Sequence, residues 1–303
     1  MHAFDRILRR SAEIKSLCVA GLDPNLDLMP ANFVAQYDLG GPMWADELAR
    51  LFFDYNKLFV EATAGLVAAV KPQAAYYEAL GAPGIASLAS IVRFCRERDL
   101  PVILDAKRND IGSTSEAYAR AYLSGGVVKG APPAIEADAL TVNPYMGADS
   151  LAPFVKAAQQ AKKGLFVLVK TSNPGSKDFQ DLPLGDATLA ARVAKMVDDL
   201  GRDTIGPSGF SAVGAVVGAT FPSEAEALRK LMPHALFLVP GIGAQGGDVR
   251  MVRAFLNTDG RGAVVNASRS VYYPADKNVA VASLPEIFRD NVEKLRESIN
   301  RNI

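Results

Sequence analysis

The sequence predicts an α/β fold, a (β/α)8 TIM barrel that forms a single domain over residues 1–303. Short apolar runs alternate with longer segments of helical periodicity, which is the pattern of βαβ units around a parallel sheet. Eight such pairs follow one another, as a barrel of 303 residues requires. Because no linker or low-complexity stretch divides the chain, we expect one domain, with a doubly wound open sheet as the alternative.

The first expected element is an amphipathic helix in MHAFDRILRRSAE, where Phe4, Ile7 and Leu8 fall on one face. This segment lacks the apolar core of a secretion signal. The strands are expected at short apolar runs that turn residues or charged residues terminate. In chain order these runs are 16–23, 66–73, 100–107, 137–144, 164–171, 211–220, 235–243 and 262–269.

The segments between the strands repeat their apolar residues at helical spacing, which predicts a helix after each strand. These helices are expected at 45–65, 84–98, 113–123, 148–161, 186–201, 222–232, 247–256 and 283–300. Three connections are long and rich in Gly, Pro, Asn or Asp, namely 24–44, 124–136 and 172–185. Long loops in a compact domain are usually functional or disordered. Two of the three follow strand ends, where a barrel has its active site.

Charge and cysteine content narrow the classes of function. Lys+Arg and Asp+Glu balance at 33 each, so no overall basic field attracts nucleic acid. Cys18 and Cys95 are isolated and lack metal-ligand spacing. Two such thiols indicate a reducing compartment. The most apolar window, 206–219, is too short to span a bilayer. We therefore expect a cytoplasmic protein without a nucleic-acid or membrane partner.

The two histidines, His2 and His234, are poor candidates for catalysis. His2 is terminal, and His234 lies in KLMPHALF, a connection between a helix and a strand. A Ser-His-Asp or Cys-His enzyme is therefore not expected.

The third strand ends in an unusual concentration of charge, LDAKRND. Side chains alternate along a strand, so Ile103, Asp105 and Lys107 should face the barrel axis. Asp105 and Lys107 are then the last inward positions at the carboxyl end, and Asp110 begins the loop. The sequence thus places two carboxylates and an ammonium group at the end of one buried strand.

The two preceding strands also end in charge, with Asp23 after the first and Lys71 after the second. Successive strands are neighbours in a sequentially wound barrel, so Asp23, Lys71, Asp105 and Lys107 should converge. Each could instead be a solvated charge that ends a strand. An alternating Lys-Asp array offsets the cost of burying charge and keeps each member ionised.

The opposite side of the barrel has features of a phosphate site. The seventh strand runs into VPGIGAQGGD, in which Gly241, Gln245 and Gly246 precede a helix expected from about residue 247. Glycines let backbone N–H groups approach an anion closely. Arg269 ends the eighth strand, and the loops after strands seven and eight are the usual phosphate site of this fold. The alternative is an ordinary glycine turn.

The fifth strand runs into VKTSNPGS. Ser172 and Asn173 could hydrogen-bond a polar ring or amide, although Asn-Pro-Gly also forms turns by itself. An inward-facing Lys170 could form a Schiff base.

The segment DAKRNDIGST, residues 105–114, resembles the D-x-K-x-x-D-I-x-x-T segment of orotidine 5′-phosphate decarboxylases. Asp23, Lys71 and the PGIGAQGG loop at 240–247 occur in the order that this family has them. DAKR and SNPGS resemble its longer, type 2 subfamily. The resemblance covers the whole barrel, and the charged segment is its most specific part.

This resemblance implies cofactor-free decarboxylation of orotidine 5′-monophosphate to UMP by a homodimer. It implies that Lys107 protonates C6 of the pyrimidine, with Lys71 and Asp105 as its partners. It also implies that Asp110 reaches into the neighbouring subunit's site. The residues implied beside Asp110 are Ile111 and Thr114.

The resemblance further implies how the nucleotide is bound. Asp23 would contact the ribose hydroxyls, Ser172 the pyrimidine, and Gln245 and Arg269 the phosphate. The chain departs from the family at Ser268, where many members have glycine.

Three other functions stay open on the residues alone. A metal-dependent sugar-phosphate decarboxylase or isomerase would need more carboxylates and fewer lysines around its ion. A Schiff-base aldolase would use Lys170 or Lys107. A non-catalytic nucleotide-binding function would not explain why a Lys-Asp array is buried.

Overall fold

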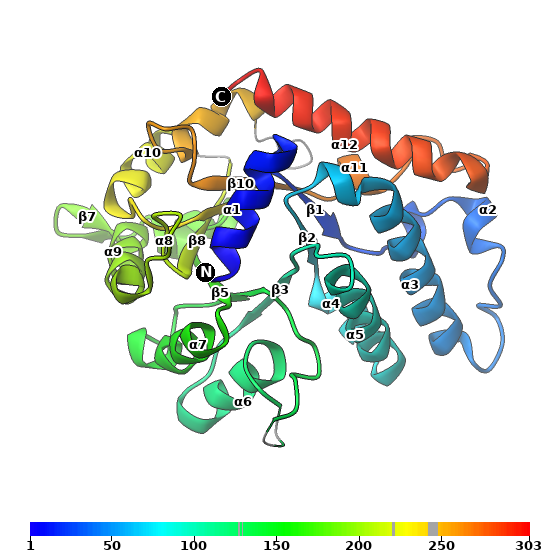
Figure 1. Cartoon of the computed structure of the whole chain (residues 1–303), viewed down its shortest axis with the longest axis horizontal. Helices are drawn as coiled ribbons and strands as arrows, with labels where there is room; N and C mark the ends of the chain where they lie inside the picture. Colours follow the sequence, from blue (N-terminus) through cyan, green and yellow to red (C-terminus); the bar gives the residue numbers. More distant parts are fainter. Residues whose placement is uncertain (127, 129, 220–221, 242–247) are drawn as a thin grey trace.

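In the part of the chain that the structure describes, eight parallel strands form the barrel and lie around it in the order β2-β1-β10-β9-β8-β5-β4-β3 (Figure 1). This computed structural model describes residues 1–126, 128, 130–219, 222–241 and 248–303. Parallel bridges between Val70 and Val102 and between Gln73 and Asp105 join β2 to β3 and close the ring. The predicted barrel is confirmed, since every strand overlaps its expected range. The strands are β1 (Cys18–Leu22), β2 (Ala69–Pro72), β3 (Ile103–Arg108), β4 (Ala139–Val142), β5 (Gly164–Lys170), β8 (Val213–Val217), β9 (Phe237–Val239) and β10 (Ala263–Ala267).

Helices surround the strands, as the alternating sequence pattern predicts. The longer ones are α1 (Ala3–Ile14), α3 (Trp44–Thr63), α5 (Ala82–Arg96), α6 (Gly112–Tyr122), α7 (Ala148–Ala161), α9 (Leu189–Gly201), α10 (Pro222–Leu231) and α12 (Leu284–Asn300). The shorter ones are α2 (Ala31–Val34), α4 (Ala74–Glu78), α8 (Lys177–Gln180) and α11 (Arg269–Tyr272). None of the helices in the described part of the chain combines the length and apolarity needed to cross a membrane.

In the range 247–256, where a helix is expected, the structure has a 3₁₀ helix and not an α-helix. The chain forms a 3₁₀ helix, η5 (Val249–Phe255), after Asp248, whose carboxylate accepts a hydrogen bond from the Arg250 amide. Residue 247 lies outside the described part of the chain. Helical periodicity does not separate the two helix types, and short connectors commonly use the tighter form.

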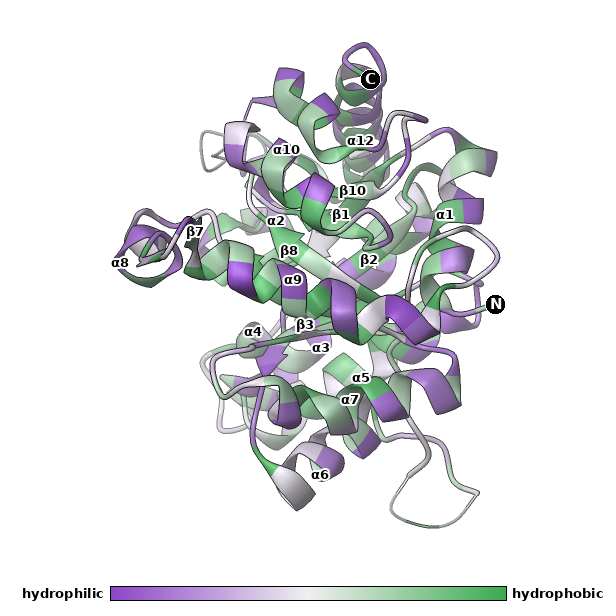
Figure 2. Cartoon of the chain, turned by 90° about the vertical axis from the view of Figure 1, so that its left-hand side faces the viewer, coloured by the Kyte–Doolittle hydropathy of each residue, from purple (hydrophilic) through white to green (hydrophobic). Residues whose placement is uncertain are grey.

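The barrel has two apolar layers, and hydropathy colouring shows the strands as largely apolar (Figure 2). The larger layer lies between strands and helices. The smaller one fills the barrel and contains Phe4, Ile7 and Leu8 of α1 together with Ile103 and Phe166. The rings of Phe4 and Phe166 lie 4.5 Å apart, centroid to centroid. In Figure 1, α1 lies across the end of the barrel that faces the viewer. It therefore closes the amino end, and the carboxyl end is left for a site.

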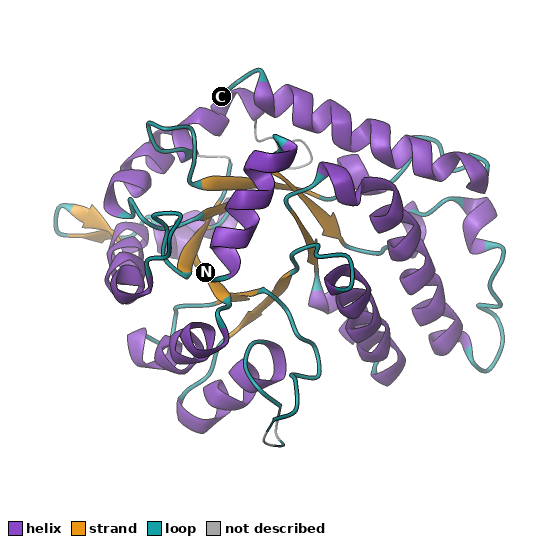
Figure 3. Cartoon of the chain, viewed as in Figure 1, coloured by secondary structure: helices purple, strands orange, loops and turns teal. Residues whose placement is uncertain are grey.

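The long connections contain short elements (Figure 3). The connection 24–44 holds η1 (Leu26–Leu28) and α2. The connection 172–185 holds η3 (Pro174–Ser176), α8 and β6 (Pro183–Leu184), which pairs antiparallel with β7 (Ala187–Thr188). In the connection 124–136, the described residues form neither helix nor strand.

Candidate functional site

A cavity of about 540 Å³ opens where the strands end at their carboxyl side. Seven of the predicted site residues line it, on β2 and β3 and in the segments that follow β1, β5, β9 and β10. These are Asp23, Lys71, Asp105, Lys107, Ser172, Gly241 and Arg269. The sequence thus predicted residues from six different strand ends that meet at one cavity.

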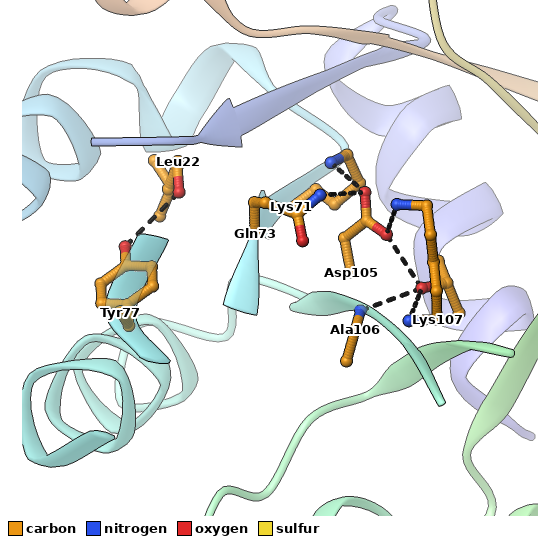
Figure 4. Close-up of polar contacts among 8 residues, drawn as sticks. Leu22, Lys71, Gln73, Tyr77, Asp105, Ala106 and Lys107 are labelled. Atoms are coloured by element: carbon orange, nitrogen blue, oxygen red, sulfur yellow. Dashed lines mark hydrogen bonds and ion pairs between the residues drawn. The ribbon is translucent and has the colours of Figure 1, made fainter. Parts of the chain in front are cut away.

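Asp105 lies at the centre of the charged cluster (Figure 4). Its Oδ2 accepts a hydrogen bond from Lys71 Nζ at 2.7 Å, and its Oδ1 accepts one from Lys107 Nζ at 2.6 Å. Two neutral side chains complete the shell of this carboxylate. Gln73 Nε2 donates to Oδ2 at 3.1 Å, and Thr141 Oγ1 donates to Oδ1 at 2.9 Å. The carboxylate is therefore held from four sides.

Burial and charge act in opposite directions on this cluster. Burial opposes the ionisation of Asp105, but the ammonium groups of Lys71 and Lys107 outweigh it and hold the pKa of this carboxyl well below its usual value. Burial likewise disfavours charge on Lys71, yet Asp105 and then Asp23 raise the pKa of Lys71 above its ordinary value. An ionised Asp105 and a charged Lys71 are thus the stable forms at neutral pH.

A bulge in β3 brings Lys107 into this arrangement. The pairing of β3 with β4 shifts register between Leu104 and Arg108. Lys107 adopts a left-handed backbone conformation (φ 49°), which is uncommon for a residue with a long side chain. Thr141 Oγ1 accepts hydrogen bonds from the amides of Ala106 at 3.0 Å and of Lys107 at 2.9 Å, in place of strand pairing. Strained backbone of this kind collects at functional sites, where neighbouring contacts maintain it.

Thr141 and Gln73 were not expected from the sequence. Thr141 reads as an ordinary residue of strand ALTV, and Gln73 follows Pro72 without a charge to mark it. Both line the cavity, as do Tyr76 and Asn266. Only their register against Asp105 reveals them, and register is a property of the folded sheet.

Asp23 and Asn266 each have a buried acceptor atom among the described residues that line the cavity. Tyr273 fixes the main chain at Asp23, since its hydroxyl donates to the Asp23 carbonyl at 2.6 Å and accepts from the Asn25 amide at 2.7 Å. Oδ1 of Asp23 and Oδ1 of Asn266 are buried and have no hydrogen-bond partner within the described ranges. Because buried polar atoms are normally paired, ligand hydroxyl or N–H groups would suit these positions.

The predicted phosphate end is described in part. Gly241 has a positive φ of 98° that favours glycine, and it lines the cavity with Arg269. Gln245 and Gly246 lie outside the described residues. Ser268 fits beside Arg269 because the neighbouring residue Gly21 has no side chain. A Cβ at Gly21 would come within 2.0 Å of Ser268 Oγ.

Asp110, Ile111 and Thr114 do not line the cavity of their own chain. Asp110 Oδ1 accepts a hydrogen bond from the Ile111 amide at 2.8 Å. Ile111 is 56% exposed, and Thr114 in the first turn of α6 is exposed as well. The chain turns away from the cavity at this point and presents these side chains on the surface.

The sequence left open whether Lys170 faces the barrel cavity, and the structure shows that it does not line the cavity. The register of β5 against β8 shifts between Leu168 and Lys170, and Leu168 lines the cavity whereas Lys170 does not. Lys170 is fully buried and forms ion pairs with Asp181 and Glu224. A Schiff base at Lys170 would require this paired ammonium to lose its proton behind the cavity wall.

A larger groove of about 940 Å³ lies near the amino ends of β8, β9 and β10. Three of the arginines that line it have partners among the described residues. Arg250 pairs with Asp248, Arg261 pairs with Asp259, and the buried Arg229 donates to main-chain carbonyls. Because the convergent ionisable groups lie at the other end of the barrel, the smaller cavity is the candidate active site.

Known proteins resemble this chain in sequence and in structure. The model of the Orotidine 5′-phosphate decarboxylase / HUMPS family matches residues 51–284. Orotidine 5′-phosphate decarboxylase of Rhodopirellula baltica is 45% identical over 258 residues, 85% of this chain and 84% of that protein. The enzyme of the same name from Caldicellulosiruptor bescii is 39% identical over 300 residues, 99% of this chain and 98% of that protein.

Solved structures agree with these relatives. Leishmania donovani OMP decarboxylase has a TM-score of 0.71 and 33% identity, over 98% of this chain and 99% of that one. Leishmania donovani UMP synthase has a TM-score of 0.76 and 36% identity over 100% of this chain, which spans 56% of that longer protein. The chain therefore belongs to the Orotidine 5′-phosphate decarboxylase / HUMPS family and is an enzyme of its decarboxylase branch.

Proposed function

We propose that this protein converts orotidine 5′-monophosphate to UMP and CO2 without a cofactor, as the last step of de novo pyrimidine synthesis. The observation that carries the proposal is the carboxylate of Asp105, which lies between the ammonium groups of Lys71 and Lys107 at the cavity. The names of the relatives at 39–45% identity support this substrate.

The chemistry calls for a fixed positive charge. Loss of CO2 leaves an electron pair on C6 of the pyrimidine, with no adjacent carbonyl to delocalise it. The ammonium group of Lys107, preorganised by Asp105, stabilises that charge and then donates the proton that C6 needs. Lys71 holds Asp105 ionised and in place from the other side. Lys107 suits this role because its side chain lines the cavity and is 46% exposed. Its Nζ is at the same time fixed by a hydrogen bond to Asp105.

Electrostatic repulsion of the substrate carboxylate by Asp105 is a smaller contribution. Two like charges about 4 Å apart repel by about 4 kcal/mol at an effective dielectric of about 20. Enzymes that act on very slow reactions lower the barrier by roughly 20 kcal/mol. Stabilisation of the transition state by Lys107 therefore dominates, aided by binding energy from the phosphate.

The nucleotide spans the cavity in this proposal. Asp23 binds the ribose hydroxyls, Ser172 contacts the pyrimidine, and Arg269 binds the phosphate beside Gly241. Gln245 and Gly246 would complete the phosphate site. The unpaired Oδ1 of Asp23 within the described residues supports the ribose role.

The competing reactions fit the geometry less well. Both oxygens of Asp105 already accept hydrogen bonds from ammonium groups, so a divalent cation would have to displace a lysine. Of the two lysines considered for an aldolase, Lys170 and Lys107, Lys107 lines the cavity and Lys170 does not. An ammonium group that is bound to Asp105 is a poor nucleophile. Borohydride trapping with a carbonyl substrate would reveal that alternative.

A homodimer is part of the proposal. Asp110, Ile111 and Thr114 lie outside their own cavity, which is where residues that serve a partner subunit would lie. We also propose a cytoplasmic location, since Cys18 and Cys95 are both free thiols and free thiols are typical of a reducing compartment.

The decisive experiment follows the absorbance of orotidine 5′-monophosphate in the near ultraviolet with EDTA present and no cofactor added. We expect rapid conversion to UMP by the wild type. Lys107→Ala should lower turnover by at least about 1,000-fold while UMP still binds. Lys294→Ala, at an exposed position of α12, is the matched control. Near-normal turnover by Lys107→Ala would refute the assignment.

A further inference from the structure

A buried ion cluster lies behind one wall of the cavity. Lys170, the last residue of β5, is fully buried. Its ammonium group pairs with Asp181, directly after α8, and with Glu224 Oε2 at 3.0 Å, in the first turn of α10. Burying a lone ammonium group is costly, so these carboxylates hold three segments of chain together. Lys170 itself does not line the cavity.

The chain after Lys170 forms that wall, and it is folded back onto its own strand. Gln180 Oε1 accepts a hydrogen bond from the Thr171 amide at 2.8 Å, and Gln180 Nε2 donates to Thr171 Oγ1 at 2.8 Å. Thr171 Oγ1 donates in turn to Asn173 Oδ1 at 2.7 Å. The adjacent Gln180 and Asp181 thus tie both ends of the segment 171–181 to the end of β5.

The neighbouring strand fits closely against this wall. The amide of Gly218, just after β8, donates to the Lys170 carbonyl at 2.8 Å. A side chain at Gly218 would come within 2.9 Å of the main chain of Ser172. Thr171, Ser172 and Asn173 all line the cavity. The wall therefore has little freedom once the ion cluster holds its two ends.

We propose that Lys170 is a positioning residue that fixes the wall Thr171–Asn173 for recognition of the pyrimidine ring, without touching the substrate. This inference rests on the proposed function. Its physical basis is preorganisation, because polar groups that are ordered before binding do not lose conformational freedom when the ligand arrives. The phosphate and ribose contacts lie on other strand ends, so the effect of Lys170 should be confined to the base.

The test compares UMP with ribose 5-phosphate, which lacks the base, by isothermal titration calorimetry. In Lys170→Met, UMP affinity should fall about tenfold or more, while ribose 5-phosphate affinity stays within about twofold of the wild type. Asp181→Asn removes one of the two carboxylates that pair with Lys170, at a partly exposed position. It should shift the ratio of the UMP and ribose 5-phosphate affinities in the same direction, and it provides the test if Lys170→Met fails to fold.

Lys163→Met is the matched control. Lys163 is also buried and also pairs with two carboxylates, Glu136 at 3.1 Å and Asp138 at 3.8 Å, but it lies just before β5, at its amino end. Its loss should leave the ratio of the two affinities unchanged. An unchanged ratio in both Lys170→Met and Asp181→Asn, or an equal change in Lys163→Met, would overturn the inference. A wild type that binds UMP without releasing CO2 would refute the proposed function and still allow this test.

Discussion

Asp105 is the residue at which folding and chemistry are most closely joined. Its carboxylate is buried. The hydrogen bonds that it accepts from described side chains come from Lys107 on the same strand, from Lys71 on β2, from Gln73 just after β2 and from Thr141 on β4. A carboxylate in this position stabilises the fold only while it is ionised, and it serves the proposed reaction only in that same form. Its titration therefore reports on both.

We predict that Asp105→Asn lowers the free energy of unfolding by about 3 kcal/mol at neutral pH, because Lys71 remains buried without its nearest counter-ion. The pKa of Asp105 is lower in the folded chain than in the unfolded chain. Its contribution is thus complete above about pH 4 and fades as the pH falls further, by at most about 1.4 kcal/mol per pH unit.

Urea unfolding of wild type and variant at several pH values from 7 to 3 would measure that difference. Asp290→Asn, at an exposed position of α12, should show no such dependence. A difference that stays constant from neutral pH down to the acid limit of the folded state would contradict this account.

At the scale of elements, α1 contributes to the stability of the barrel but lies far from the candidate active site. Phe4 inserts into the barrel and contacts Phe166, and a side chain at Gly164 would come within 2.5 Å of the Phe4 ring. The N-terminus of α1 is fixed by a capping box between His2 and Asp5. This helix closes the end of the barrel opposite the cavity.

Phe4→Ala should therefore lower the free energy of unfolding by about 3–5 kcal/mol, because a fully buried ring leaves a void that close-packed neighbours cannot fill. Turnover per folded molecule should be close to that of the wild type. Phe179→Ala removes a ring that is 60% exposed and is the stability control. A loss of stability no larger than the control's would show that α1 is not part of the barrel core.

At the scale of the whole molecule, the sequence allowed the barrel and most of the charged cluster to be predicted. Alternation along β3 and the repeated charge at strand ends depend only on local periodicity, and both are readable from residues. The shell of Asp105 was missed because Thr141 and Gln73 acquire their role from the register of neighbouring strands. The orientation of Lys170 stayed open for the same reason, since a register shift at the end of β5 breaks the alternation.

If Asp110 acts in the partner subunit's active site, a single chain does not form a complete site. Mixing two kinds of subunit tests this. Chains carrying Lys107→Ala and chains carrying Asp110→Ala should each be nearly inactive alone. Random pairing makes about half of the dimers mixed, and one of the two sites in each mixed dimer has both Lys107 and the partner's Asp110. We therefore expect co-refolded chains to recover about one quarter of wild-type turnover per subunit. If Asp110 instead served its own chain, each mixed dimer would hold two damaged sites, and activity would not rise above that of the parents.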